Sequence, residues 1–266
     1  MLENPRSPRV RAVAKLTKRS ARTETGLFLL EGPQSVREAL TYAPDAIIDL
    51  FATPTGWEKH ADLREKAADA GIEVEYVTED VLDAMADTVT PQGVVAAVRQ
   101  TPTSVKDIFA TSPQLIAICE EVRDPGNLGT IIRAADAAGA DAVVLTGRTV
   151  DLYNPKVVRS STGSLFHLPI SVGGDLGDVI QRAHAAGLQV LAADVKGDDL
   201  LSVRAGEALS KPTGWLFGNE ARGLSDELLA LADGALKLPI FGKAESLNLA
   251  TAASVCLYES AFAQRA

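Results

Sequence analysis

An α/β fold in two domains is predicted by the order of the apolar segments, by the length of the chain and by a polar interruption near its middle. Short apolar runs alternate with helically spaced apolar residues along most of the chain, the pattern of α/β domains. The 266 residues suffice for one large domain or two ordinary ones. A polar stretch at 99–113, with Pro102 and Pro113, breaks the alternation. We therefore expect one domain over residues 1–98, a linker over 99–113 and a second domain over 114–266.

In the first domain, apolar runs mark strands and helically spaced apolar residues mark helices. Gly71 ends one of these helices, and Thr78, followed by two acidic residues, begins another. The expected strands are 28–30, 46–52, 72–77 and 94–98. The expected helices lie within 10–25, after Ser35, at 57–70 and at 78–87.

The second domain repeats the alternation. Its expected strands are 115–119, 142–145, 189–192, 215–217 and 238–240. Its expected helices are 128–138, which Gly139 ends, 155–159, 178–186, 225–231 and 248–259. Ser225 is expected to cap the fourth of these helices and Ser246 the last. The segment 160–164 is expected to be a polar loop.

Composition narrows the functional classes. Hydrophobic residues make up 46% and charged residues 23% of the chain, as in globular proteins. No run approaches the roughly 20 apolar residues that span a bilayer, and the first residues lack the apolar core of a signal peptide. Cys119 and Cys256 lie far apart in apolar segments, and the three histidines are scattered. We expect a cytoplasmic protein without a disulfide or a metal site.

The distribution of charge points to a polyanionic partner more than the total does. The whole chain has a formal charge of −9, but residues 1–24 contain seven basic and two acidic side chains, a local balance of +5. Because charge acts through surface patches, this stretch is either a solvated helix face or a surface for phosphates.

Glycine-bearing polar loops follow three of the expected strands, at 120–127, 218–223 and 241–247. Two of these strand ends and the start of the last helix can converge on one spot, so a ligand site is expected there. Neither G-x-G-x-x-G nor G-x-x-x-x-G-K-[ST] occurs, which disfavours a dinucleotide or a nucleoside triphosphate.

The polar residues of these loops each have a structural and a functional interpretation. Arg133 stands one helical turn after Gly129 and would lean toward the loop, although it could instead pair with Asp136. Asn127 could simply cap its helix, and Glu220 could be a solvent-facing turn residue. The side-chain amide of Asn248, at a tight junction, needs hydrogen-bond partners.

Three stretches in this order resemble the motifs of the SpoU (TrmH-type) RNA ribose 2′-O-methyltransferases of the SPOUT superfamily. They are Asn127-x-Gly129-x-x-x-Arg133 with Gly139, the segment 216–224, and the segment from 238 to Asn248. Arg9 and the segment 26–32 resemble the family's substrate-binding domain, a small α/β fold related to RNA-binding ribosomal proteins.

This resemblance implies a parallel-sheet SPOUT domain with a trefoil knot that holds S-adenosylmethionine, and a homodimer with the active site near its interface. The catalytic set that it implies is Asn127, Arg133, Glu220, Ser246 and Asn248. The cofactor-binding set is Leu216, Phe217, Gly218, Asn219, Leu238, Ile240, Leu247 and Asn248. The RNA-binding set is Arg9, Arg11, Lys15, Lys18, Arg19, Arg22, Glu31, Gly32, Arg159 and Ser161.

The activity that the resemblance implies is S-adenosylmethionine-dependent methylation of a ribose 2′-hydroxyl in structured RNA, with ribosomal RNA favoured by the separate N-terminal domain. Arg133 is expected either to act as the base or to clamp a phosphate. A transfer RNA methyltransferase, a catalytically silent RNA-binding protein and, remotely, a dinucleotide-dependent enzyme remain as alternatives.

Overall fold

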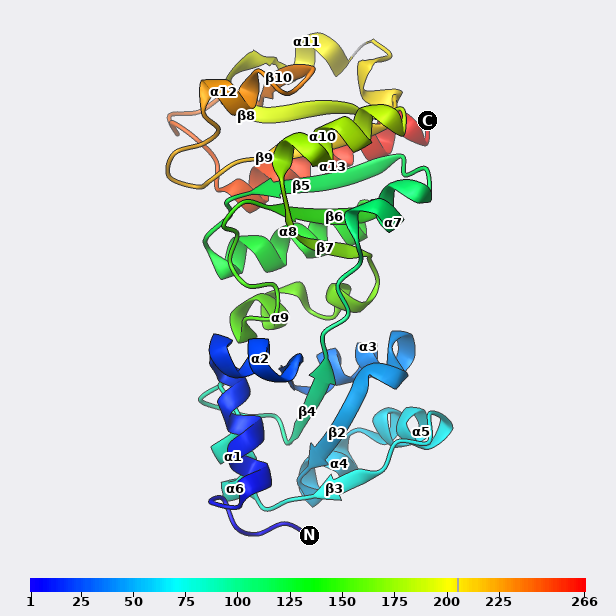
Figure 1. The fold of residues 1–266 in the computed structure, drawn as a ribbon, viewed down its shortest axis with the longest axis vertical. Coiled ribbons are helices and arrows are strands. Elements are labelled where there is room, and N and C mark those ends of the chain that lie inside the picture. Colours follow the sequence, from blue (N-terminus) through cyan, green and yellow to red (C-terminus); the bar gives the residue numbers. More distant parts are fainter. Residues whose placement is uncertain (205) are drawn as a thin grey trace. The chain divides into compact units, whose positions relative to one another are not determined.

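A computed structural model describes residues 1–204 and 206–266, which form two compact units (Figure 1). The first unit comprises residues 1–101 together with 151–167, and the second comprises 102–150 and 168–266. The segment 151–167, which the sequence assigns to the second domain, thus groups with the first. No helix within the described residues combines the length and apolar character needed to cross a bilayer.

The first unit contains a four-stranded mixed sheet in the order β1-β4-β2-β3. Strand β4 is antiparallel to both β1 and β2, whereas β2 and β3 are parallel. The strands are β1 (Leu27–Glu31), β2 (Ile47–Ala52), β3 (Val74–Tyr76) and β4 (Val94–Arg99). All four expected strands are therefore confirmed.

Helices cover this sheet and pack with it to form a hydrophobic core. Leu29, Phe51 and Val95 of the sheet pack in one buried cluster with residues of α1 and α6. The single helix expected over 57–70 is two helices, because the backbone leaves the helical region at His60 (φ −122°, ψ 71°). The helices are α1 (Pro8–Ala14), α2 (Arg19–Thr25), α3 (Pro33–Tyr42), α4 (Pro54–Lys59), α5 (Ala61–Asp69), α6 (Glu79–Met85) and α9 (Pro155–Ser161).

The second unit contains a six-stranded sheet, entirely parallel, in the order β10-β8-β9-β5-β6-β7. Strands β6 and β7 follow β5 on one side of the sheet. Strands β8, β9 and β10 lie on the other side of β5, with β9 between β5 and β8. The strands are β5 (Leu115–Glu120), β6 (Ala142–Thr146), β7 (Ile170–Gly174), β8 (Gln189–Asp199), β9 (Thr213–Phe217) and β10 (Gly234–Lys237). Ligands bind at such switch points, outside the carboxyl ends of the strands.

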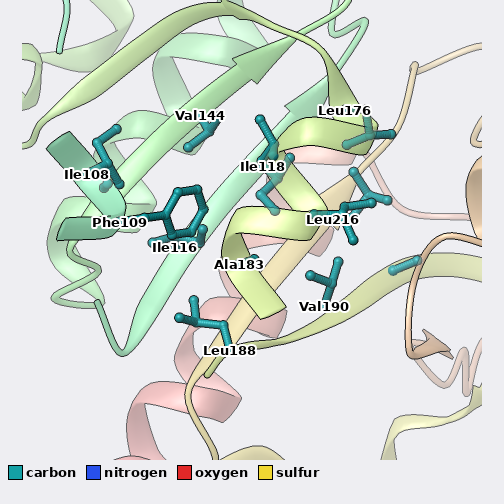
Figure 2. Close-up of a cluster of buried hydrophobic side chains, with 14 of the residues drawn as sticks. Ile108, Phe109, Ile116, Ile118, Val144, Leu176, Ala183, Leu188, Val190 and Leu216 are labelled. Carbon is teal, nitrogen blue, oxygen red and sulfur yellow. The ribbon is translucent and has the colours of Figure 1, made fainter. Parts of the chain in front are cut away.

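Helices pack on both faces of this sheet. On one face, Ile116, Ile118 and Leu216 join a buried cluster with residues of α7 and α10 (Figure 2). Successive strand residues point to opposite faces, so Trp215 lies on the other face, where its Nε1 donates to Ser260 of α13 at 2.9 Å. The helices are α7 (Val105–Ala110), α8 (Pro125–Ala137), α10 (Leu176–Ala185), α11 (Leu200–Arg204), α12 (Asp226–Leu229) and α13 (Leu249–Gln264).

Several expectations for this unit are wrong. The expected linker contains α7, whose Ile108 and Phe109 are buried in the core. The last strand ends at Lys237, before the expected 238–240, and β7 was not expected at all. Helix α13 is capped by Asn248 instead of Ser246.

Candidate active site

Three side chains from separate loops form one hydrogen-bonded chain at the carboxyl edge of the parallel sheet. Asn127 lies in the first turn of α8, after β5; Glu220 follows β9; and Asn248 precedes α13. The amide Nδ2 of Asn127 donates to Oε1 of Glu220 at 3.2 Å, and Nδ2 of Asn248 donates to Oδ1 of Asn127 at 2.9 Å. The structure therefore brings together three of the five expected catalytic residues.

The carboxylate of Glu220 is held by backbone donors as well. It accepts from the backbone N–H groups of Arg123 (3.1 Å to Oε2) and Asp124 (2.9 Å to Oε1). Partial burial would raise the pKa of Glu220, but these hydrogen bonds and that from Asn127 outweigh it and hold the pKa below its ordinary value. Glu220 is therefore an ionised hydrogen-bond acceptor that fixes the loop after β5.

The two asparagines have different structural roles. Asp124, instead of Asn127, caps α8: its Oδ1 accepts from the backbone N–H of Asn127 at 2.8 Å. Asn248 caps α13 by accepting from the backbone of Ala250 at 2.9 Å, and its amide N–H groups remain available to Asn127. The side-chain amide of Asn127 is thereby fixed by two hydrogen bonds: its Nδ2 donates to Glu220 and its Oδ1 accepts from Asn248.

Arg133 is exposed on α8, one turn after the buried Gly129. Across residues 1–204 and 206–266, its side chain makes no hydrogen bond or ion pair, so the expected alternative of a pair with Asp136 is not formed. The structure does not bring Arg133 into the hydrogen-bonded chain. Its guanidinium remains available to an external anion.

A cavity of about 380 Å³ lies beside Glu220. Its walls comprise residues 193–196 of β8, 219–224 after β9, 236–238 around the end of β10, Ile240, 245–247 before α13, and Leu249 and Ala252 of α13. Ser246 and four residues of the expected cofactor-binding set contribute to them. These four are Asn219, Leu238, Ile240 and Leu247.

Other members of the expected cofactor-binding set do not line the cavity. Leu216 and Phe217 are completely buried within the sheet layers. Asn219, which does line the cavity, also shapes its own loop, because its Oδ1 accepts from the backbone of Ala221 at 3.0 Å and its Nδ2 donates to the carbonyl of Glu121 at 2.9 Å.

Gly218 permits a close backbone approach at the floor of the same loop. A Cβ at this position would lie 2.7 Å from Cγ of Leu224 and 2.8 Å from the backbone of Gly223. Only glycine fits there without displacing the loop.

Sequence reasoning missed the wall that β8 contributes. Ala193, Asp194, Val195 and Lys196 line the cavity, but the expected strand stops at residue 192. No local pattern marks this wall, because it follows from the parallel pairing of β8 with β9, whose ends share an edge of the sheet. No group of three metal-ligating side chains occurs in the described part of the chain.

The expected RNA-binding residues divide into exposed and engaged groups, all in the first unit. Arg11, Lys15, Lys18 and Arg19 are exposed. Arg22, in contrast, is 2% exposed and donates to Asp151 at 2.6 Å, so it is a structural ion pair and not a phosphate contact.

Three further members of that set make contacts within the unit. Arg9 pairs with Asp49 and Glu75. Arg159 donates to Glu31 at 2.9 Å. Ser161 is buried and donates to a carbonyl of its own helix at 2.8 Å, which removes it from any surface that RNA could contact.

Both units match known protein families. Residues 114–258 match the SpoU rRNA Methylase family and residues 7–96 match an MRM3-like substrate binding domain. A 23S rRNA (guanosine(2553)-2'-O)-methyltransferase of Bacillus subtilis is 35% identical over 97% of each chain. A 23S rRNA (uridine(2479)-2'-O)-methyltransferase of Streptomyces viridochromogenes is 34% identical over 93% of this chain and 86% of its own.

Among solved structures, the AdoMet-bound rRNA methyltransferase of Sinorhizobium meliloti superposes with a TM-score of 0.83 at 34% identity, over 97% of this chain and 96% of that one. The SpoU methyltransferase AviRb of Streptomyces viridochromogenes, in complex with AdoMet, gives a TM-score of 0.81 at 32% identity, over 97% and 99%. These matches span both units. The chain therefore belongs to the SpoU rRNA methylase family.

Proposed function

We propose that the protein transfers a methyl group from S-adenosylmethionine to a ribose 2′-hydroxyl of ribosomal RNA. The observation that carries this proposal is the hydrogen-bonded chain of Asn127, Glu220 and Asn248 next to a cavity at the strand ends. Support also comes from the relatives, whose names specify 2'-O-methylation of 23S rRNA and whose structures contain AdoMet.

The cavity fits the cofactor in size and lining. Its volume of about 380 Å³ lies within the range of small-molecule sites. Ile240 and Leu247 are 38% and 41% exposed, and this apolar surface would be covered by a bound adenosine group. Asp194 and Ser246 supply polar atoms in the same walls. When bound, the cofactor supplies the electrophilic methyl group.

Glu220 positions the site and does not remove the proton. Its lowered pKa makes it a weak base at neutral pH, and its oxygens already accept from three donors. Through Asn127 it fixes the loop that a ribose would contact. Asn248 completes this arrangement from the other side, so the role of the chain is alignment.

Arg133 clamps a phosphate next to the reacting ribose. Its guanidinium is exposed and unpaired among the described residues, and an arginine, which is not deprotonated in proteins, is a poor base. A bidentate contact to a phosphate would hold the nucleotide, and the positive charge would stabilise the developing alkoxide. Proton transfer to water completes the reaction.

Contacts with RNA phosphates provide most of the sequence-independent affinity for RNA. These contacts would be made by four exposed basic side chains, those of Arg11, Lys15, Lys18 and Arg19. Ribosomal RNA is preferred to transfer RNA because two relatives that match both units carry 23S rRNA names. The bacterial relatives that are named for 23S rRNA support a cytoplasmic location.

Two structural features complete the proposal. Val255, Tyr258 and Phe262 form an exposed apolar face on α13, being 39%, 36% and 62% exposed, and a second copy of the chain would cover it in a homodimer. The segment between β10 and α13 would thread the trefoil knot that the family resemblance implies.

Methyl transfer tests the proposal directly. Purified protein with tritium-labelled S-adenosylmethionine should label unmodified 23S rRNA and leave unmodified transfer RNA unlabelled. An Arg133→Lys variant should bind RNA but turn over slowly, because an ammonium cannot replace a bidentate clamp. RNA binding without any labelling would instead identify a catalytically silent protein.

A further inference from the structure

A second cavity lies entirely within the first unit. It has a volume of about 300 Å³ and is formed by the start of α3, the loop 88–92, strand β4 and the end of α9. Gly32 and Ser35 line it around the start of α3, Gln92 from the loop and Thr162 directly after α9. None of these residues contributes to the active site described above.

Ser35 presents a hydrogen-bonding group to this cavity. The residue is only 6% exposed and lines the cavity, yet its hydroxyl has no hydrogen-bond partner within residues 1–204 and 206–266. The chain does not enclose this hydroxyl, which opens onto the cavity, where a polar group of a ligand can take the place of water as its partner. Gln92, exposed at the cavity, likewise has a side-chain amide without a partner among the described residues.

The local charge decides which chemical group fits. Arg159 lines the cavity, but its Nη1 donates both to Glu31 at 2.9 Å and to Asp87 at 2.8 Å. One guanidinium against two carboxylates leaves a formal charge of −1 for this cluster. A phosphate would meet net negative charge, whereas phosphate sites rely on cations that are not already neutralised.

A neutral planar group with both donors and acceptors suits the lining better. A hydroxyl and a carboxamide each donate and accept, which matches the edge of a nucleobase. Val94 and Pro91 add apolar surface for the face of the ring. Val89 lies in the adjacent loop and is 101% exposed, so an unstacked nucleotide would find apolar contact at the rim as well.

We propose that this cavity holds an unstacked nucleobase of the RNA substrate and thereby selects the site that is methylated. The proposal rests on the proposed function, because it takes RNA to be the substrate. Ser35 and Gln92 contact the edge of the base. Arg159 acts through Glu31, whose Oε1 accepts from the backbone N–H of Asp87, and so shapes the cavity instead of binding a phosphate.

Amide NMR of the full-length protein tests the chemistry of the site with defined probes. Nucleoside 5′-monophosphates at about 1 mM and above should shift the signals of Gly32, Ser35 and Gln92, because single nucleotides bind weakly. Inorganic phosphate and ribose 5-phosphate should leave these signals unchanged. Equal shifts with inorganic phosphate, or no shift with any probe, would overturn the proposal.

Binding to an unmodified 23S rRNA transcript tests the same residues in the RNA complex. Ser35→Ala and Gln92→Ala should each weaken binding about 3- to 10-fold, the effect of one hydrogen bond, and should leave the salt dependence unchanged. Thr41→Ala, an exposed hydroxyl at the other end of α3, and Gln181→Ala, an exposed amide on α10, are the matched controls and should bind like the wild type.

The two proposals fail in different ways. Without the proposed function, the wild type would transfer no methyl group to RNA. Without the base site, the wild type would remain active and both cavity variants would bind RNA as tightly as the controls do. A salt slope lowered by about 1 in either cavity variant would identify a phosphate contact and refute the base site.

Discussion

Glutamine in place of Glu220 tests whether this residue positions the active site or removes a proton. The substitution keeps the shape of the side chain and one oxygen. That oxygen can stay at the Oε1 position, where the donors from Asp124 (2.9 Å) and Asn127 (3.2 Å) meet. The amino group then faces the backbone N–H of Arg123, which is shared between Oε2 at 3.1 Å and Oε1 at 3.2 Å, so one branch of this hydrogen bond and the negative charge are lost.

The magnitude follows from the hydrogen bonds. Bonds to a charged acceptor contribute about 1.5–3 kcal/mol each, roughly twice those to a neutral acceptor. Because Glu220 is partly exposed, we expect a modest effect from Glu220→Gln. Stabilisation of the transition state should fall by about 1–2 kcal/mol, which corresponds to about 10-fold in kcat/KM. Glu220→Ala removes both oxygens and should cost about 100-fold. Loss of a general base would instead cost about 10²–10⁴ with either substitution.

The assay is methyl transfer to 23S rRNA as a function of pH. The pKa of Glu220 lies below its ordinary value, so the carboxylate is charged throughout the neutral range. Its contribution should therefore be constant above about pH 5 and should disappear as the pH falls through the pKa of the folded state. A Glu220→Gln variant as inactive as Glu220→Ala, or one with a changed pH profile near neutrality, would refute the positioning role.

Other perturbations follow from close contacts and buried pairs. Gly218→Ala places a Cβ 2.8 Å from the loop backbone and should abolish binding of S-adenosylmethionine in calorimetry, whereas Gly242→Ala, with no atom within 4 Å, should not. Ser260→Ala leaves Nε1 of Trp215 buried without its 2.9 Å acceptor and should lower the free energy of unfolding in urea by about 1–3 kcal/mol. Arg22→Ala leaves its carboxylate partner without a cation and should destabilise the first unit by about 3 kcal/mol in hydrogen exchange; unchanged protection there would contradict a structural role.

Apolar runs in the sequence predicted the central buried strands well, because such a run within one segment is enough to indicate a buried strand. The segments 115–119 and 142–145 are uninterrupted apolar runs, and both are central parallel strands. The segment 238–240 has a similar apolar character but contains Pro239, which cannot donate to a sheet ladder, and the strand ends before it. Asn248 and Ser246 are both good capping residues, and spacing alone does not decide between them.

Features that depend on distant contacts were beyond local patterns. The assignment of 151–167 to the first unit depends on tertiary packing. The same holds for Arg22, whose neighbours in sequence are exposed bases but whose own side chain meets Asp151. At the site, the motifs identified Asn127 and Glu220, while the wall from Asp194 depended on knowing that β8 lies next to β9.

Mapping of ribose methylation in the organism tests the central claim most directly. Total RNA from a strain without the protein should lack one 2′-O-methyl group in 23S rRNA that the wild-type strain carries. Expression of the wild-type protein should restore that group, and expression of the Arg133→Ala variant should not. An unchanged methylation map of ribosomal RNA, or a methyl group lost from transfer RNA instead, would contradict the account.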